Sequence, residues 1–397
     1  MMPHQSTHLF REVHLQDDLR AERCLSAPRF GPRIVFFSGG SALNDISRRL
    51  KAYTHNSAHL ITPFDSGGSS GILRTTFDMP AVGDLRSRLM ALADETELGQ
   101  PEIYALFSYR LPTDQKPKYL WKELESFSNG EHELISDISQ PMRMIIQGLL
   151  QKFCDISHGD FDLRGASIGN LVLTGGYFLN ERLLEPTLYL MSKMVNVLGT
   201  VRAVVDSNLH IGVELADGTI IHGQKAITGK EVAPLTCEIK RIFLSDGSSE
   251  VPRKHAPLPK RNRKLIERAD MICYPPGSLY SSVLANLLPR GTGEAIIQRQ
   301  VPKIYIPSLG RDPECLEKSL CQQITALIDV AAQDVKPTLP ASQVVTHVLC
   351  DDSISKDMCL EAEQKFGIKT IRAKLHDQHA PTKYDPDKIC RALMAFG

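Results

Sequence analysis

The chain has 397 residues, and its 46 Lys and Arg balance 46 Asp and Glu, so the formal net charge at pH 7 is zero. This balance argues against a global attraction to nucleic acid or to an anionic membrane surface. No apolar run reaches the roughly 18 residues of a membrane-spanning helix, and residues 1–30 lack the basic segment and apolar core of a leader, so we expect a cytoplasmic protein.

The first elements predict a parallel sheet. Residues 1–30 show little periodicity and are expected to form an arm or an edge element. A strand at 33–38 leads into a helix whose apolar residues recur every three or four positions, and a second strand at 58–62 ends at a loop over 65–71. Short apolar runs that alternate with helices are typical of an α/β fold, here a Rossmann-like three-layer core with ligand sites at the carboxyl ends of the strands.

The middle of the chain predicts an insertion and a hairpin. From about 85 to 198 the pattern is mainly helical, and within it 111–140 is expected to be a long surface excursion. A strand at 201–205 is followed by a β-hairpin around Asp217-Gly218. We therefore expect a nucleotide-binding core over 31–335 that carries a helical insertion.

The second half returns to the α/β pattern. The basic, proline-rich stretch 251–264 is predicted to be an exposed linker or lid. Strand, loop, helix and strand follow over 271–310, and residues 336–397 are expected to form a C-terminal α/β segment packed on the core. The nine cysteines contain no Cys-x-x-Cys pair, which favours reduced thiols over a disulfide or zinc framework.

Three glycine- and serine-rich loops follow buried strands. Main-chain N–H groups at such turns, together with a helix N-terminus, suit a phosphate. The alternatives are an ordinary strand-to-helix turn for the first loop and a flexible surface loop for the second. The residues predicted to bind the ligand through these loops are Gly39, Gly40, Ser41, Gly67, Gly68, Ser69, Ser70, Gly277 and Ser278.

Taken in chain order, the motifs resemble one family, the 2-phospholactate transferase (CofD-like) family, and within it the gluconeogenesis-factor branch. The resemblance spans about Arg33 to the C-terminus. It rests on Gly39-Gly40-Ser41, the 65–74 loop, Val82-Gly83-Asp84-Leu85-Arg86, Ser167-Ile168-Gly169-Asn170-Leu171, Val195-Asn196-Val197, Pro276-Gly277-Ser278-Leu279-Tyr280, the 217 hairpin and Tyr384-Asp385-Pro386-Asp387-Lys388.

The resemblance implies a Rossmann-like core and a nucleotide-diphosphate ligand. One branch transfers a phospholactyl group from a nucleotide-activated donor with Mg2+, and the other resembles nucleotide-sugar-binding regulators of carbon metabolism or cell-wall supply. This chain departs from the family pattern at Ala42, Ser66, Ala166 and Pro275. Asp65 is therefore the one carboxylate left in its loop to help hold Mg2+.

Charged and amide side chains complete the predicted site. Asp65, Asp84 and Arg86 are the candidate catalytic residues, and Asp65 is the candidate metal ligand. Arg74 and Arg86 can bind phosphate oxygens, although Arg86 can instead pair with Asp84. The remaining candidates are Asn170 and Asn196, for a base or sugar edge or as helix caps, and Tyr280, for base stacking or as a core residue.

These expectations support two hypotheses. The first is Mg2+-assisted transfer of a phosphate-linked group, and the second is a non-catalytic nucleotide-sugar sensor. We also expect a homodimer, from the size of the insertion. His376 and His379 have the spacing of metal ligands, but the composition around them favours a solvated loop.

Overall fold

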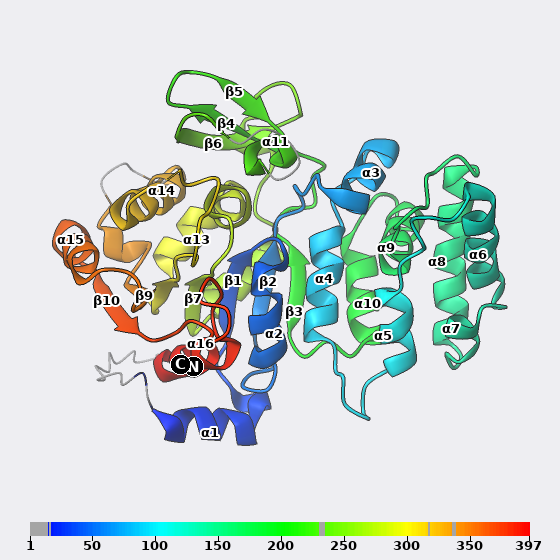
Figure 1. Ribbon diagram of the computed structural model, residues 1–397, viewed down its shortest axis with the longest axis horizontal. Helices are drawn as coiled ribbons and strands as arrows, with labels where there is room; N and C mark the ends of the chain where they lie inside the picture. Colours follow the sequence, from blue (N-terminus) through cyan, green and yellow to red (C-terminus); the bar gives the residue numbers. More distant parts are fainter. Residues whose placement is uncertain (1–14, 16, 230–234, 317, 336–338) are drawn as a thin grey trace, which may run out of the picture.

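A parallel sheet of seven strands forms the centre of the computed structural model, which describes residues 15, 17–229, 235–316, 318–335 and 339–397 (Figure 1). The strand order is β10-β9-β8-β7-β1-β2-β3, and every pairing is parallel. The strands are β1 (Ile34–Ser38), β2 (Ala58–Ile61), β3 (Thr200–Ala203), β7 (Met271–Tyr274), β8 (Lys303–Tyr305), β9 (His347–Asp351) and β10 (Lys369–Ala373). The predicted α/β fold with a mainly parallel sheet is confirmed.

Helices cover both faces of this sheet because successive strand residues point to opposite sides. Val35 and Phe37 of β1 pack against one helical layer, whereas Ile34 and Phe36 pack against the other. The first layer comprises α12 (Lys260–Glu267), the π-helix η4 (Leu279–Val283), η5 (Leu284–Leu287), α13 (Thr292–Gln298), α14 (Leu320–Ala332) and α15 (Lys356–Phe366). The second comprises α1 (Asp18–Ser26), α2 (Asn44–Leu50) and α16 (Pro386–Phe396).

Eight helices follow β2 and precede β3 along the chain. They lie on the side of the sheet where β3 is the edge strand (Figure 1), and they enclose an apolar core of their own. The prediction of a surface excursion over 111–140 is wrong, because two of these helices lie there. Leu120, Leu124 and Phe127 are fully buried at three- and four-residue spacing, a sparse stripe among polar residues. The helices are α3 (Gly68–Phe77), α4 (Gly83–Leu92), α5 (Pro101–Ser108), α6 (Pro117–Asn129), α7 (Glu133–Ser136), α8 (Met142–Ser157), α9 (Ile168–Leu179) and α10 (Glu185–Met194).

A small antiparallel sheet with the order β5-β4-β6 lies at one end of the molecule (Figure 1). The predicted hairpin forms β4 (His210–Leu215) and β5 (Ile220–His222), and α11 (Gln224–Thr228) follows it. The third strand, β6 (Ile239–Ser245), was not predicted. Its charged Lys240 and Arg241 conceal the strand pattern, and both pair with Glu214 of β4 at 2.7 Å.

The basic stretch 251–264 is not a linker or lid. It forms the short helix η3 (Arg253–His255) and the first part of α12. The Arg253 guanidinium donates to the Leu287 and Leu288 carbonyls and pairs with Asp334 at 3.2 Å. Internal contacts of this kind fix the segment to the core.

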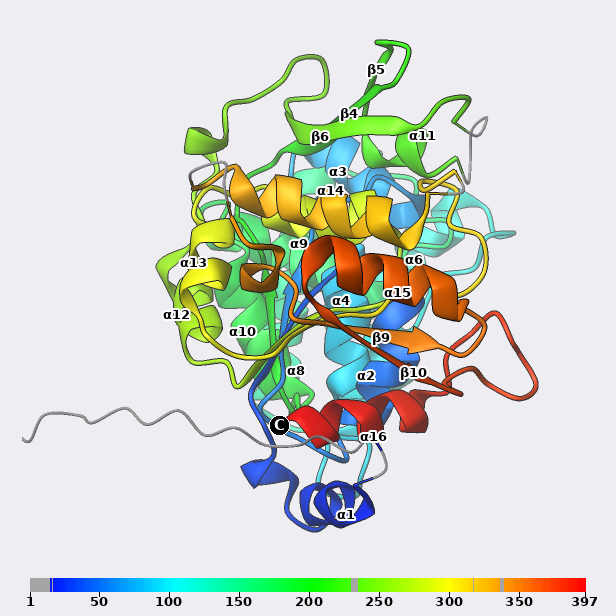
Figure 2. The ribbon, with the colours of Figure 1, turned by 90° about the vertical axis from the view of Figure 1, so that its left-hand side faces the viewer.

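The first and last helices of the described chain, α1 and α16, lie side by side (Figure 2). Helix α1 packs on α16, and Arg391 pairs with Asp18 at 3.1 Å. The last two strands, β9 and β10, extend the central sheet beyond β8. The remaining short helices are η1 (Pro28–Phe30), η2 (Ser41–Leu43) and η6 (Ala341–Gln343). Within the described ranges, every helix is too short or too polar to cross a membrane.

Candidate functional site

A polar cavity of about 310 Å³ lies where the carboxyl ends of β1, β2 and β7 meet. Because the strands are parallel, the loops that follow them gather at one edge of the sheet. All three predicted loops contribute to the walls. Among the predicted site residues, those that line it are Gly39, Gly40, Ser41, Asp65, Gly67, Asp84, Gly277 and Ser278.

Two side chains of α4 hold the turn after β1, one by its N–H group and the other by its carbonyl groups. Gly40 has φ +36°, a conformation that favours glycine, and a side chain added there would meet open space. Its N–H donates to Asp84 Oδ2 at 2.6 Å. The buried Arg88 guanidinium donates to the carbonyls of Gly39 at 3.5 Å and Gly40 at 3.3 Å. Asp84 and Arg88, one helical turn apart, therefore fix the turn in the cavity wall.

The loop after β2 presents its carboxylate to the same cavity. Asp65 Oδ1 accepts a hydrogen bond from the Gly67 N–H at 3.1 Å. The hydroxyl of Ser66 accepts one from the Lys225 N–H at 2.7 Å, so Ser66 anchors α11 in this chain. Gly68, Ser69 and Ser70 form the first turn of α3 and do not line the cavity.

The turn after β7 differs from the prediction, because protein carboxylates already occupy its helix mouth. Asp312 Oδ2 accepts from the Leu279 N–H at 2.9 Å. Glu314 Oε2 accepts from the N–H groups of Tyr280 at 3.0 Å and Ser281 at 2.8 Å. These amides cannot also bind a ligand phosphate, so this loop serves as a wall of the cavity.

Tyr280 is a core residue, and its predicted stacking on a base is wrong. Its side chain is 3% exposed, and its hydroxyl donates to the Ile239 carbonyl at 3.2 Å. Burial raises the pKa of the Tyr280 phenol above its usual value. The residue thus joins η4 to the small sheet.

The predicted arginines have structural contacts. Arg74 is 4% exposed and donates to the carbonyls of Phe64, at 3.1 Å, and Leu209, so its role as a phosphate ligand is wrong. Arg86 does not line the cavity, and its Nη1 donates to the Phe107 carbonyl at 3.4 Å. Burial lowers the pKa of each guanidinium to about 10.

The two predicted asparagines lie apart from each other. Asn170 is buried near the first turn of α3, where its Nδ2 is 3.5 Å from Ser69 Oγ. Asn196 donates to Asp94 Oδ2 at 3.0 Å beyond the far end of α4. That helix separates Asn196 from Asp84, so Asn196 does not line the cavity.

Sequence reasoning missed the wall that α11 supplies. Gln224, Lys225 and Thr228 line the same cavity as the glycine turn. Lys225 adds a cation that the predicted site lacked. Nothing in the local pattern marks it, because the residue comes to the site through the packing of the small sheet.

A second cavity of about 520 Å³ adjoins the first and shares its Ser41, Ala42 and Pro276–Ser278 wall. It is lined by basic side chains from three separate segments, Arg48, Arg311 and Lys383. Together the two cavities form an extended groove along the carboxyl edge of the sheet.

The family model for 2-phospho-L-lactate transferase CofD matches residues 34–394. A putative gluconeogenesis factor from Nostoc sp. is 29% identical over 398 residues, which cover 97% of this chain and 72% of the relative. The gluconeogenesis factor of Bacillus subtilis (strain 168) is 30% identical over 303 residues, 75% of this chain and 74% of the relative.

The fold also matches a solved structure. The crystal structure of a UPF0052-family protein from Bacillus halodurans superposes with a TM-score of 0.67 at 24% identity, and the match covers 92% of this chain and 99% of that one. The match extends over the central sheet and the helical insertion alike. On the evidence of the family model and these relatives, the chain belongs to the 2-phospho-L-lactate transferase (CofD) family.

Proposed function

We propose that the glycine-turn cavity binds the diphosphate of a nucleotide-activated donor and that the chain transfers a phosphate-linked, phospholactyl-like group from it. The observation that carries this proposal is the convergence of the Gly39–Ser41 turn, Asp65 and Lys225 on one polar cavity. Main-chain N–H groups and a lysine attract phosphate oxygens, and a carboxylate holds the accompanying cation.

The donor set of this cavity fits Mg2+. Asp65 and Asp84 supply carboxylate oxygens to the lining. The hydroxyl of Ser38 is buried in the same wall and has no hydrogen-bond partner within the described segments. Oxygen ligands of this kind, completed by phosphate and water, are what Mg2+ prefers.

The chain's own residues then orient the reaction. Asp84 and Arg88 hold the glycine turn, so that its position does not change when charge develops on the phosphate. Lys225 lines the same cavity, and its positive charge would attract the phosphate. When bound, Mg2+ would neutralise the phosphate oxygens. The transferred group or its acceptor would lie in the second cavity, beside Arg48, Arg311 and Lys383.

Calorimetric titration of the full chain with nucleoside diphosphates and nucleotide sugars, with and without Mg2+, tests this proposal. Asp65→Asn should weaken Mg2+-dependent binding at least about tenfold, because a neutral amide is a poor ligand for Mg2+. Asp114→Asn, at an exposed position outside both cavities, is the matched control. Unchanged Mg2+ dependence in Asp65→Asn would exclude the metal role.

A second candidate function is a non-catalytic nucleotide-sugar-binding regulator. Two observations favour it: Asp84 already accepts a hydrogen bond from Gly40, and Ser66 stands where the family often has a second aspartate. Chromatography of the ligand after long incubation separates the two functions, since a regulator returns it intact. A homodimer remains a prediction, and light scattering tests it.

A further inference from the structure

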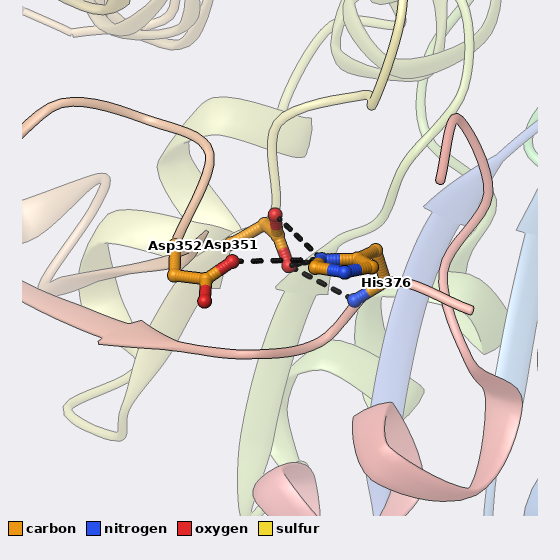
Figure 3. Close-up of side chains that lie close together, drawn as sticks. All are labelled: Asp351, Asp352 and His376. Carbon is orange, nitrogen blue, oxygen red and sulfur yellow. Dashed lines mark hydrogen bonds and ion pairs between the residues drawn. The ribbon is translucent and has the colours of Figure 1, made fainter. Parts of the chain in front are cut away.

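Three potential metal ligands meet at the carboxyl end of β9, away from the glycine-turn cavity. Figure 3 shows the imidazole of His376 facing the carboxylates of Asp351 and Asp352. His376 Nδ1 lies 3.1 Å from Asp351 Oδ2 and 3.5 Å from Asp352 Oδ1. The ligand atoms of the three residues all lie within 4.8 Å of one another. A solvated loop was expected here. Of its two histidines, His379 is exposed, whereas His376 is partly buried and contacts Asp351.

The Asp351 carboxylate is fully buried and fixed in place. It accepts hydrogen bonds from the N–H groups of Leu375 at 2.8 Å, His376 at 2.9 Å and Ser353 at 3.0 Å. Burial by itself raises the pKa of Asp351, but these hydrogen bonds outweigh it and hold the pKa well below its usual value. The three main-chain donors therefore hold the carboxylate in one orientation.

No lysine or arginine of the described segments forms an ion pair with this carboxylate. Within the described part of the chain, His376 is the one basic residue that pairs with Asp351 or Asp352. The nearby Arg372 instead donates to the main-chain carbonyls of Ile354 and Asp352. A bound divalent cation would supply positive charge to this pair of carboxylates.

The spacing of the donor atoms suits a small cation. In a tetrahedral site with bonds of about 2.0–2.2 Å, neighbouring ligand atoms lie roughly 3.4 Å apart. The two distances from His376 Nδ1, 3.1 and 3.5 Å, lie on either side of that value. One imidazole nitrogen with carboxylate oxygens is a donor set that zinc and manganese accept.

We propose that Asp351, Asp352 and His376 bind one divalent cation of the zinc or manganese class. This site is separate from the Mg2+ position near Asp65 and does not depend on it. Water would complete the coordination, because Asp352 opens to solvent with 47% of its side chain exposed. The main-chain hydrogen bonds to Asp351 act as the outer shell that orients a ligating carboxylate.

The cation would stiffen one wall of the second cavity. His376 begins a loop that closes at Tyr384 through an isolated β-bridge, and the Tyr384 hydroxyl donates to the Pro307 carbonyl at 2.6 Å. Thr382 and Lys383 at its far end line the cavity. Cation binding at the base of the loop would thus reduce the motion of the side chains that face a ligand.

Titration of the chelator-treated full chain with Zn2+ and with Mn2+ tests the proposal. We expect one site that Asp352→Asn and His376→Gln each weaken at least about tenfold, since losing even an outer-shell partner costs about that much. His379→Gln on the same loop and Asp65→Asn in the other cavity are matched controls and should leave it unchanged. In the zinc-loaded protein, nitrogen NMR should find the His376 proton on Nε2, because Nδ1 carries the metal.

Asp352 is exposed, so Asp352→Asn tests the site even if His376→Gln fails to fold. Wild-type isotherms in both Asp352→Asn and His376→Gln would overturn the proposal. It would equally be overturned if NMR showed a doubly protonated His376 and no Zn2+ or Mn2+ bound, since a proton would then hold the two carboxylates together. Loss of the site in Asp65→Asn alone would assign the cation to the glycine-turn cavity instead.

Discussion

The Gly40 N–H donates to Asp84 Oδ2 at 2.6 Å. This contact joins the glycine turn after β1 to the first turn of α4, 44 residues further along the chain. It gives Asp84 a role in the shape of the site that is distinct from cation binding. The two roles can be separated, because an amide oxygen also accepts a hydrogen bond but carries no charge.

Asp84→Ala should lower the free energy of unfolding by about 1–2 kcal/mol, since it leaves the Gly40 N–H without its acceptor. Asp84→Asn should keep most of that stability and yet weaken Mg2+-dependent nucleotide binding. Urea denaturation and calorimetric titration measure the two effects. Asp45→Ala, which removes an exposed pair with Arg48, should change stability by less than about 0.5 kcal/mol. Equal stability of Asp84→Ala and Asp45→Ala would show that the contact contributes little.

Arg88→Met should destabilise the protein by about 2–4 kcal/mol. The Arg88 side chain is 1% exposed and donates to two carbonyls of the glycine turn and to the hydroxyl of Ser47. Methionine fills a similar volume but leaves these acceptors unpaired. Burial lowers the pKa of Arg88 to about 10, which still leaves it charged at neutral pH.

Urea denaturation of Arg88→Met and of Arg23→Met, at an exposed arginine of α1 outside both cavities, gives the comparison. Nucleotide affinity should fall only in Arg88→Met, because the turn then loses its support. If the turn is held mainly by other contacts, the two variants will have similar midpoints.

The central sheet could be predicted because buried parallel strands appear as short apolar runs, as Ile34–Ser38 and Met271–Tyr274 do. Strand β6 could not, because its Lys240 and Arg241 lie on the solvent side, where they pair with Glu214. Helix α6 was missed because its buried residues are few in each turn. In both cases tertiary contacts, rather than local pattern, decide the structure.

The site was predictable where it depends on turns and not where it depends on packing. The glycine turn and Asp65 follow strands directly, so strand order alone brings them together. Lys225 reaches the cavity through the small sheet, and Glu314 fills the helix mouth from a loop after β8. Neither position carries a local signal, so the lysine in the cavity wall was missed and the carboxylates that cap the amides of residues 279–281 were not foreseen.

Tyr280→Phe should leave nucleotide affinity unchanged, because the tyrosine ring is in the core and not in the cavity. It should lower the free energy of unfolding by about 1 kcal/mol through loss of the hydrogen bond to the Ile239 carbonyl. Tyr119→Phe, at a tyrosine that is 61% exposed, should change neither quantity. A selective loss of nucleotide affinity in Tyr280→Phe would restore the stacking role.

Glu314 gives the protein a pH-dependent contribution to stability. Burial raises the pKa of Glu314 from 4.5 to about 7, and the nearby Asp312 adds to the rise, while hydrogen bonds from Ser281 and Tyr280 oppose it. The folded state therefore binds the proton more tightly than the unfolded chain does. For this group alone, stability is greatest below pH 4.5 and is lost as the pH rises to about 7.

Glu314→Gln should remove this dependence, because its amide can accept from both N–H groups and donate to the Ser281 hydroxyl. The difference in unfolding free energy between the wild type and Glu314→Gln should fall by on the order of 2 kcal/mol between pH 4.5 and pH 7. Subtracting the two curves cancels the titrating groups that do not interact with Glu314, whereas the contribution of its neighbour Asp312 remains in the difference. Exposed Glu102→Gln should give a difference that stays nearly flat over this range. A Glu314→Gln difference that is equally flat, or that rises with pH, would mean that Glu314 stays ionised throughout and acts only as a cap for the amides of Tyr280 and Ser281.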